Sequence, residues 1–256
     1  MPQGFPAADS GLPVTTPRIE AATTLLGARP AFWGRYFTSV GTTESVQYCA
    51  EENGPLNAAG IRLLPIGWQT EKVNGSETQG VSDGSNNAQS FIATFGASFL
   101  ASQGGKFYLF LDVEGSPSLS SAYYTGWAQG LAQQSAAMCQ SAGLASDAVQ
   151  LLPCVYGTQG DTETWSALAS ATSANAPCMG VWIARYDPND CQLADWSAVK
   201  VTPVSPKPFP FTILAWQLSG NCLSGQIDIS QINPSLDPQS DLLDFLVLPP
   251  PPAAAT

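Results

Sequence analysis

The chain has 256 residues and a formal net charge of -11, from 20 acidic and 9 basic side chains. This shortage of basic side chains argues against nucleic acid as a partner, because neutralising phosphates requires a basic face. The absence of His excludes Ser-His-Asp and Cys-His catalysis, His-ligated zinc and imidazole acid–base chemistry. Any hydrolytic reaction must therefore use carboxylates or other non-histidine side chains.

Short apolar runs predict strands that alternate with helical segments over most of the chain. The predicted strands are residues 4–9, 32–37, 62–69, 106–115, 150–156, 180–187, 211–218 and 226–232. The predicted helices are residues 16–26, 45–59, 86–101, 120–142 and 163–174, with one further helical turn at 195–199. The polar, Gly-rich residues 70–84 are expected to form a long loop after the third strand.

The order of these elements predicts an α/β fold, a TIM-like barrel in which five strand–helix units precede three strands that lack full helices. An open, doubly wound sheet is the competing architecture. No internal repeat is visible, so we expect a single barrel domain over residues 1–245 and a Pro/Ala-rich tail over 246–256. No apolar run reaches the roughly 18 residues of a membrane span, so none is expected.

None of the six cysteines belongs to a CxxC pair, so a zinc knuckle is not supported, and no metal site is predicted. Cys139 and Cys154 fall in apolar segments and are expected to be buried thiols. Cys178, Cys191 and Cys222 lie in expected loops and are the better disulfide candidates, with the pairing left open. This cysteine usage favours a secreted or extracytoplasmic protein, with a cytoplasmic one as the alternative, and residues 1–10 do not resemble a signal peptide.

The strand at residues 106–115 ends on two acids one residue apart, Asp112 and Glu114. Residues two apart in a strand point to the same face, so both carboxylates should project together from the end of a core strand. Tyr108 and Phe110 share that face, which we expect to point into the barrel. Because barrels keep their chemistry at the carboxyl ends of their strands, this acidic pair is the best catalytic candidate in the chain.

Other polar and aromatic side chains occupy the ends of the predicted strands. Besides the acidic pair, they are Asp9, Arg35, Trp68, Tyr156, Tyr186, Trp216, Gln217 and Asp228. Carboxylates beside aromatic rings are typical of sugar sites, where acids transfer protons and rings stack on the sugar. The carboxylates are therefore candidate catalytic groups, and the other side chains are candidate substrate contacts. No GxGxxG or Walker pattern is present, so no nucleotide cofactor is predicted.

The order of these motifs resembles a known family. An early Asp, then DVE at 112–114, WIARY at 182–186, AWQLSG at 215–220 and IDIS at 227–230 resemble the family 25 glycoside hydrolases, the muramidase-type lysozymes. GRYF at 34–37 and NAAGIRLLPIGWQ at 57–69 look closer to a related bacterial group, the glycoside hydrolase-like domain of poorly defined activity. The likeness extends over about residues 4–235.

The resemblance implies a glycosidase that acts on an N-acetylated glycan such as peptidoglycan, with Glu114 as the general acid. Asp112 would be its partner, and Asp228 and Asp9 would complete the acidic cluster. Pro6 stands where the family carries its first-strand Asp, so Asp9 is assigned to that role from its distance to the GRYF strand. Crowded carboxyls in an apolar cleft raise one another's pKa, as a general acid requires.

Each assignment has a purely structural alternative. Arg35 could pair with Asp9 or Asp112 inside the barrel mouth, Trp68 and Trp216 could pack in the barrel, and Asp228 could cap a turn. The other tryptophans are expected in the core or between helices; they are Trp33, Trp127, Trp165, Trp182 and Trp196. The alternative function is a catalytically silent barrel that binds a glycan or a protein partner. A monomer is expected in either case.

Overall fold

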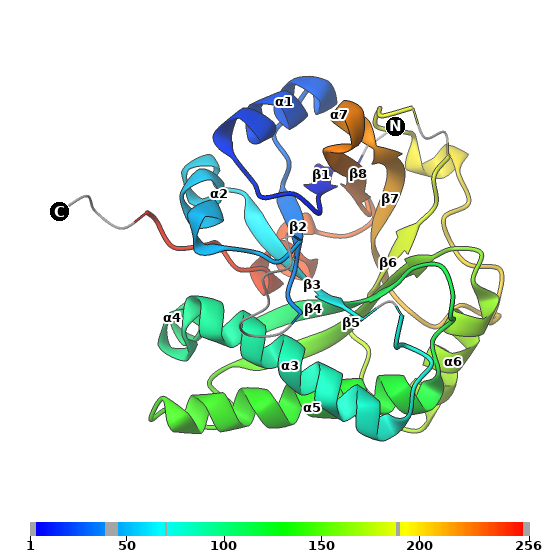
Figure 1. The fold of residues 1–256 in the computed structure, drawn as a ribbon. Coiled ribbons are helices and arrows are strands. Elements are labelled where there is room, and N and C mark those ends of the chain that lie inside the picture. The colour runs from blue at the N-terminus through cyan, green and yellow to red at the C-terminus, as the bar shows by residue number, and fades with distance from the viewer. Residues whose placement is uncertain (1–3, 39–45, 70, 188–189, 253–256) are drawn as a thin grey trace.

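The computed structural model describes residues 4–38, 46–69, 71–187 and 190–252. Within these residues, strands β1 to β8 close a barrel in chain order (Figure 1). The strands are Pro6–Asp9, Phe32–Tyr36, Arg62–Trp68, Lys106–Val113, Gln150–Thr158, Val181–Ala184, Ile213–Asn221 and Ile227–Ile232. The predicted α/β barrel is therefore confirmed, and the open sheet is excluded.

The last strand differs from the others in direction. Neighbouring strands from β1 to β7 pair in parallel, whereas β8 runs antiparallel to both β7 and β1. Asp228 stands near the start of β8, not at its end as expected for a parallel strand. Because β8 is reversed, its start lies at the same rim as the carboxyl ends of the parallel strands. Asp228 is therefore paired directly with Asp9 of β1.

Helices cover the outside of the barrel. The longer ones are α1 at Thr16–Leu26, α2 at Asn53–Ala59, α3 at Glu77–Phe95, α4 at Ala97–Ser102, α5 at Ser121–Ser141 and α6 at Thr162–Ser173. The short ones are α7 at Cys222–Gly225, α8 at Pro238–Asp241 and the 3-10 turns Ala50–Glu52, Trp196–Ala198 and Leu243–Phe245. No helix in the described ranges has the length and apolarity that a bilayer crossing requires.

Three helix boundaries differ from the sequence-based expectation. Residues 77–84, expected in a loop, form the first turns of α3, because the Ser76 side chain accepts a hydrogen bond from Gln79 N and caps the helix. The helix expected over 86–101 is broken at Gly96, whose φ of 82° ends α3 before α4 begins. The helix expected at 45–59 also begins later: residue 45 lies outside the described residues, Gln47 pairs with Tyr36 of β2, and the helical turns start only at Ala50.

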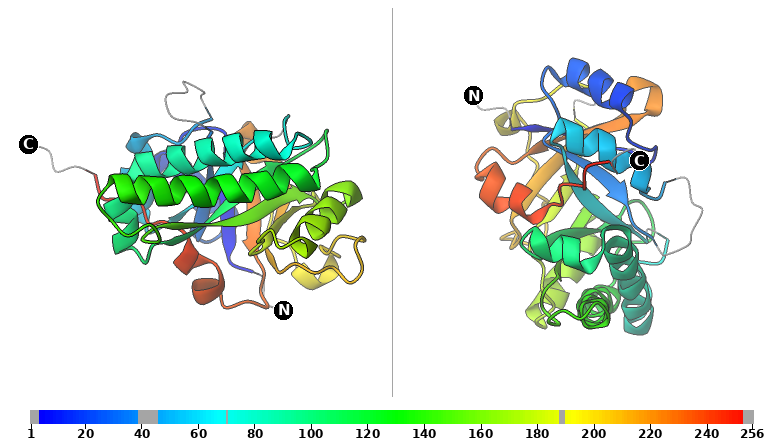
Figure 2. Two further views of the ribbon diagram at one scale, coloured as in Figure 1. Left: turned by 90° about the horizontal axis from the view of Figure 1, so that it is seen from below. Right: turned by 90° about the vertical axis from the view of Figure 1, so that its left-hand side faces the viewer.

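The glycines of residues 77–84 are helix contacts and not loop residues. A Cβ on Gly80 would lie 2.1 Å from the Tyr123 carbonyl oxygen of α5, and one on Gly84 would lie 2.2 Å from that of Trp127. On the opposing helix, a Cβ on Gly126 would lie 2.0 Å from the Glu77 carbonyl oxygen. Both views of Figure 2 show α3 and α5 side by side along the barrel. Glycine on both helices thus allows their backbones to touch.

The core has two layers, separated by the sheet. Inside the barrel, Phe32, Phe110 and Trp182 are fully buried, together with most of Tyr108. Leu109 and other outward-facing residues pack under the helices. The alternation of inward and outward side chains predicted for the 106–115 strand is therefore confirmed.

The C-terminal segment packs against the opposite end of the barrel from Asp9. Phe245 stacks on Tyr108 with ring centroids 4.6 Å apart, and Val247 is fully buried and pairs with Leu63 of β3. The Asn57 side chain donates a hydrogen bond to the carbonyl oxygen of Pro249. The packed part of the chain thus extends beyond residue 245, into the segment assigned to the tail.

A disulfide joins Cys191, in the segment after β6, to Cys222, in the turn between β7 and β8. Two of the predicted candidates therefore pair with each other. The third, Cys178, is a free thiol in the structure. Cys139 and Cys154 are buried thiols, as expected.

The backbone contact between α3 and α5 can be tested with Gly80→Ala. Since the added Cβ meets a carbonyl oxygen at 2.1 Å, the helices must separate, and we expect the free energy of unfolding to fall by about 2–3 kcal/mol. Gly160→Ala is the matched control, because a Cβ there meets nothing within 4 Å, and it should change stability by less than about 0.5 kcal/mol. Equal stabilities of the two variants in urea denaturation would contradict this account.

Candidate functional site

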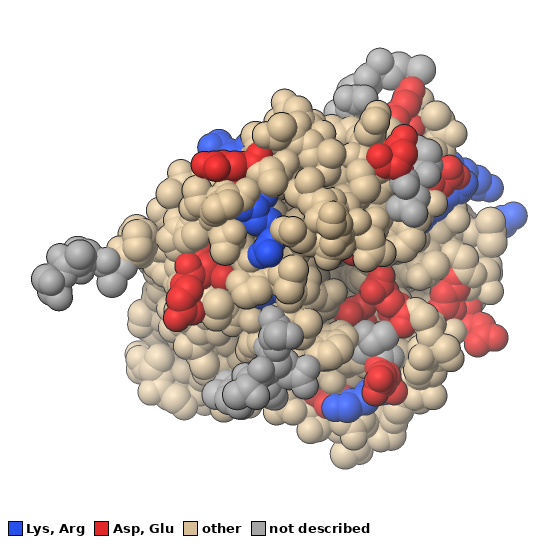
Figure 3. Space-filling view, turned by 45° about the horizontal axis from the view of Figure 1, so that its top comes forward, with Lys and Arg blue, Asp and Glu red and all other residues tan. Residues whose placement is uncertain are grey.

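Four carboxyl groups gather at the rim formed by the carboxyl ends of the parallel strands. Asp9 ends β1, Asp112 lies near the end of β4, Glu114 follows β4, and Asp228 lies in β8 beside Asp9. Asp9 and Asp112 are buried, whereas Glu114 and Asp228 are partly exposed. Figure 3 shows acidic side chains around a hollow in the molecular surface. The four acids that the sequence predicted as catalytic are thus at one end of the barrel.

Gln217 of β7 connects these carboxyls. Its Nε2 donates to both carboxylate oxygens of Asp9 at 3.1 Å and to Asp228 Oδ2 at 3.3 Å. Its Oε1 accepts a hydrogen bond from the Tyr186 hydroxyl at 2.9 Å and another from the Tyr156 hydroxyl. The carboxamide therefore lies between two acids on one side and two phenols on the other.

Glu114 lies on the phenol side of this arrangement. The Tyr156 hydroxyl is in hydrogen-bond contact with Glu114 Oε1, and the Tyr186 hydroxyl is 3.4 Å from the same atom. Asp228 is fixed from the other side by the backbone N–H of Asn221, which donates to Oδ1 at 2.7 Å. Glu114 is partly exposed, so its carboxyl is accessible to solvent.

Burial is the main reason that three of the acids titrate abnormally. It raises the pKa of the Asp9 carboxyl well above its usual value, and the neighbouring Asp228 charge raises it further. Burial also raises the pKa of Glu114, partly opposed by the hydrogen bond from Tyr156 and reinforced by the Asp228 charge. The pKa of Asp228 is raised by burial, against the effect of the Asn221 N–H. The cluster therefore holds protons at a pH where ordinary carboxyls have lost them.

Two aromatic side chains at the strand ends keep exposed surface. Trp68, at the end of β3, is 37% exposed, and Tyr186, after β6, is 47% exposed. Tyr36 of β2 contacts Trp68 edge-on, with ring centroids 6.2 Å apart. Burial and the charges of the four carboxylates together raise the pKa of the Tyr36 phenol. Rings and acids thus occur together, as sugar binding requires.

Arg35 and Trp216 were predicted to contact substrate, and the structure contradicts both predictions. Arg35 is fully buried, and its Nε lies 2.7 Å from Glu52, so its partner is neither Asp9 nor Asp112. Trp216 is also fully buried and packs edge-on against Trp196. Each is adjacent in sequence to a residue that points toward the acids, so alternation along the strand turns it outward, under the surrounding segments.

Tyr156 and Gln217 were also predicted as substrate contacts, and their burial argues for a supporting role. Only 2% of Tyr156 and 1% of Gln217 are exposed. Both use their polar atoms on one another and on the acids, and the Tyr156 ring packs against Trp182 at 4.4 Å. They hold the carboxyls in place from below the surface.

Sequence reasoning did not identify Gly34 as part of the site. A Cβ at this position of β2 would lie 2.7 Å from Asp9 Cβ and 3.4 Å from the Trp182 ring. Glycine therefore provides the space into which Asp9 and the tryptophan pack. The only available signal was a glycine inside an aromatic strand, which often marks a close approach of another group.

The buried pair of Arg35 and Glu52 fixes the backbone next to Asp9. Arg35 Nη1 donates to the Ser10 carbonyl oxygen at 2.6 Å, directly after Asp9 in the chain. Glu52 also accepts the backbone N–H of Val14 at 2.7 Å. Arg35 and Glu52 therefore stabilise the loop that follows Asp9. Both side chains are buried and do not reach the surface themselves.

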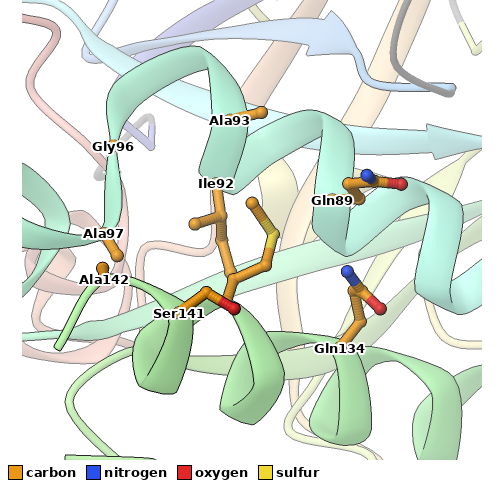
Figure 4. Close-up of a pocket in the computed structure, with 9 residues that line it drawn as sticks. Gln89, Ile92, Ala93, Gly96, Ala97, Gln134, Ser141 and Ala142 are labelled. Atoms are coloured by element: carbon orange, nitrogen blue, oxygen red, sulfur yellow. The ribbon is translucent and has the colours of Figure 1, made fainter. Parts of the chain in front are cut away.

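The acidic cluster does not form a metal site in the described residues, and a cavity of the structure lies away from it. In the described residues, no group of three or more His, Cys, Asp and Glu residues has an arrangement suited to a metal ion. A cavity of about 460 Å³ lies elsewhere, between the C-terminal parts of α3 and α5 and the start of α4 (Figure 4). Its lining includes Gln89, Ile92, Gln134 and Met138 but no carboxylate, so it is separate from the acidic cluster.

The chain matches no model of a protein family, and it matches no curated protein. Among solved structures, it is similar to an uncharacterized protein of B. stearothermophilus, with 20% identity, a TM-score of 0.64, and 95% of this chain and 100% of that chain covered. A muramidase from Trichobolus zukalii gives 18% identity, a TM-score of 0.53, and coverage of 94% and 99%.

A Tat-secreted protein of Mycobacterium tuberculosis, in complex with HEPES, gives 14% identity, a TM-score of 0.50, and coverage of 93% and 98%. Each similarity extends over nearly the whole of both chains. At these identities the comparisons show that this chain shares its barrel fold with these proteins, a muramidase among them, which agrees with the fold that the resemblance in the sequence implied.

The structural role of Arg35 predicts a large stability loss in Arg35→Met. The substitution leaves Glu52 buried without its counter-ion, so we expect the free energy of unfolding to fall by about 3–5 kcal/mol. Arg185→Met is the control, because Arg185 pairs with Asp187 at the surface, and it should cost less than about 1 kcal/mol. A direct role of Arg35 in ligand binding would instead weaken binding while leaving thermal stability near that of the wild type.

The raised pKa of Asp9 predicts that Asp9→Asn stabilises the protein near neutral pH. In the unfolded chain this carboxyl titrates near about pH 4, and in the folded protein its pKa is higher. Its contribution to stability is therefore fully present below about pH 4 and is lost as the pH rises through the folded value. The advantage of the variant in urea denaturation should be largest near about pH 7 and shrink toward about pH 4.

Asp147→Asn is the control for this experiment, because Asp147 is exposed and outside the cluster. Its stability should follow that of the wild type across the same pH range. An Asp9→Asn protein that is less stable than the wild type at neutral pH would show that the Asp9 charge is compensated by its hydrogen bonds.

Proposed function

We propose that this protein hydrolyses an N-acetylated glycan such as peptidoglycan, with Glu114 as the general acid. The observation that carries the proposal is the setting of Glu114: a partly exposed carboxyl in contact with two tyrosine hydroxyls, with its pKa raised by burial and by the Asp228 charge. A carboxyl in this setting keeps its proton to a higher pH than an ordinary carboxyl does, and it can give that proton to the glycosidic oxygen.

The neighbouring acids support the remaining steps. As the bond between the anomeric carbon and the glycosidic oxygen breaks, the carbon gains positive charge, which carboxylates stabilise. Asp9 and Asp228 accept hydrogen bonds from the Gln217 amide, which favour their ionised forms. Asp112 is the expected partner of Glu114 in orienting the reacting sugar. Water then adds to the anomeric carbon and loses its proton to a carboxylate.

Exposed aromatic surface supports a sugar as the ligand. The rings of Trp68 and Tyr186 remain accessible at the strand ends, and aromatic faces are a common platform for sugar rings. The muramidase among the structural neighbours has the same fold. The Cys191–Cys222 disulfide and the Tat-secreted neighbour support an extracytoplasmic location.

The burial of two acids favours a second candidate, a barrel that binds a glycan or a protein partner without hydrolysing it. Asp9 is 4% exposed and Asp112 is 2% exposed, so neither presents much surface to a ligand. In this case Trp68 and Tyr186 would still form the contact surface, and the acids would shape the hollow.

The variant Glu114→Gln separates these candidates. It keeps the side-chain shape and removes the transferable proton, so hydrolysis should fall by about 100- to 10,000-fold while glycan binding persists. Release of reducing ends from peptidoglycan and from chitin-type oligomers measures the first quantity, and calorimetry with soluble fragments measures the second. Glu20→Gln, at an exposed position of α1, is the matched control and should hydrolyse like the wild type.

A wild-type protein that releases no reducing ends from either substrate would rule out the hydrolytic proposal. If that protein still binds the soluble fragments, and binding weakens in Trp68→Ala, the binding function is supported instead.

A further inference from the structure

Gln217 uses every hydrogen-bonding atom of its carboxamide within the site. Its two N–H groups face Asp9 and Asp228, and its oxygen accepts from Tyr156 and Tyr186. The residue is 1% exposed, so water does not substitute for these partners. Rotating the amide by 180° would direct its oxygen at two carboxylates, so only one orientation satisfies all four neighbours.

The backbone around Gln217 aims this side chain. Gln217 pairs with Ser230 of β8, but Ser219 pairs with Ile229, so β7 carries one extra residue directly after Gln217. Such a bulge changes the direction of neighbouring side chains and is common beside active sites. Beyond the bulge, the N–H of Asn221 reaches Asp228. The two groups that donate hydrogen bonds to Asp228, the Gln217 amide and the Asn221 N–H, thus lie on either side of this bulge.

When Glu114 is ionised, the single hydrogen of Tyr156 cannot serve both of the oxygens that its hydroxyl contacts. Tyr156 contacts both Gln217 Oε1 and Glu114 Oε1, but it has a single hydrogen to donate. If it donates to an ionised Glu114, no hydrogen separates the Tyr156 and Gln217 oxygens. If Glu114 carries a proton, Glu114 donates to Tyr156 and Tyr156 donates to Gln217, so both contacts of the Tyr156 hydroxyl are hydrogen bonds.

Other titratable groups face the same network from the surrounding strands. They are Asp9 of β1, Tyr36 of β2, Asp112 and Glu114 from β4 and its end, Tyr156 of β5, Tyr186 after β6 and Asp228 of β8. Nearby carboxylate charges oppose further ionisation of Asp9 and of the phenols. The hydrogen bond from Gln217 acts in the opposite direction on Asp9 and lowers its pKa.

We propose that Gln217 is a positioning residue that biases the proton of the carboxyl cluster toward Glu114 and away from Asp9 and Asp228. Its N–H groups stabilise the two aspartates as anions. Its oxygen favours the hydrogen-bond chain that runs from protonated Glu114 through Tyr156. One neutral side chain thereby favours the protonated form of Glu114 and, against the effect of burial, the ionised forms of Asp9 and Asp228. This pairing has a catalytic purpose only if the proposed glycosidase function holds.

Substitution of Gln217 should redistribute the proton, and carboxyl-carbon NMR titration measures this directly. In Gln217→Met, Tyr156 becomes free to donate to ionised Glu114, so the Glu114 midpoint should move to lower pH. Asp9 and Asp228 lose amide donors, so their midpoints should move to higher pH. Gln217→Asn keeps an amide with a shorter reach and should give the same directions, so either variant suffices if the other does not fold.

Gln231→Met is the matched control. Gln231 is an equally buried glutamine of the same barrel, and its carboxamide bonds only the backbone of Ala194 in the described structure. Its substitution should lower stability without moving the Glu114 midpoint. A Glu114 midpoint that is unchanged in both Gln217 variants, or equally changed in Gln231→Met, overturns the inference.

The route through Tyr156 is tested by a double-mutant cycle. In the Tyr156→Phe background, Gln217→Met should move the Glu114 midpoint less than it does in the wild type, because the connecting hydroxyl is gone. Equal movement in both backgrounds contradicts the proposed chain.

The titrations do not depend on turnover, so the two proposals can fail separately. Midpoints that move as expected in a protein without hydrolytic activity uphold the role of Gln217 and refute the glycosidase function. Fixed midpoints in an active enzyme do the reverse. In an active enzyme, the basic limb of the pH profile of kcat/KM should also move to lower pH in Gln217→Met.

Discussion

Closure of the barrel between its first and last strands is the constraint on which the site depends. The antiparallel pairing of β1 with β8 brings Asp9 beside Asp228, although 218 residues separate them in the sequence. Burial raises the pKa of both carboxyls, and the Asp228 charge raises that of Asp9 further, so ionising the pair is unfavourable. The backbone hydrogen bonds of the closing strands, and the Gln217 amide that bridges both carboxylates, oppose the repulsion between them. The fold thus maintains a local arrangement that is unfavourable by itself.

The buried ion pair of Arg35 and Glu52 stabilises the backbone next to the acidic cluster. Arg35 and Glu52 lie outside the barrel wall and hold the backbone that follows Asp9. The protein therefore keeps this buried ion pair outside the barrel wall and its crowded acids at the open end. Arg35 therefore helps to shape the site through the backbone, although its own side chain is fully buried.

Residues with local signals were predicted well from the sequence. The apolar run ending at Asp112 and Glu114 gave both the strand and its inward face, because hydrophobic alternation is a local property. The inward or outward direction of Arg35 and Trp216 was not predictable, since both faces of a barrel strand are buried and apolar. The glycines at 80 and 84 favour a loop when only their local sequence is considered. They are needed because α5, some 40 residues further along the chain, packs against them.

The position of β8 also has a consequence for biosynthesis. While the chain is being translated, β1 has β2 as a neighbour but lacks its other partner until residues 227–232 have left the ribosome. Until then the nascent sheet is open, with two unpaired edges available to other chains. Asp9 also remains in water during this period, and its desolvation takes place only as the last strand is added. Premature termination before residue 227 would therefore leave an aggregation-prone sheet instead of a smaller folded domain.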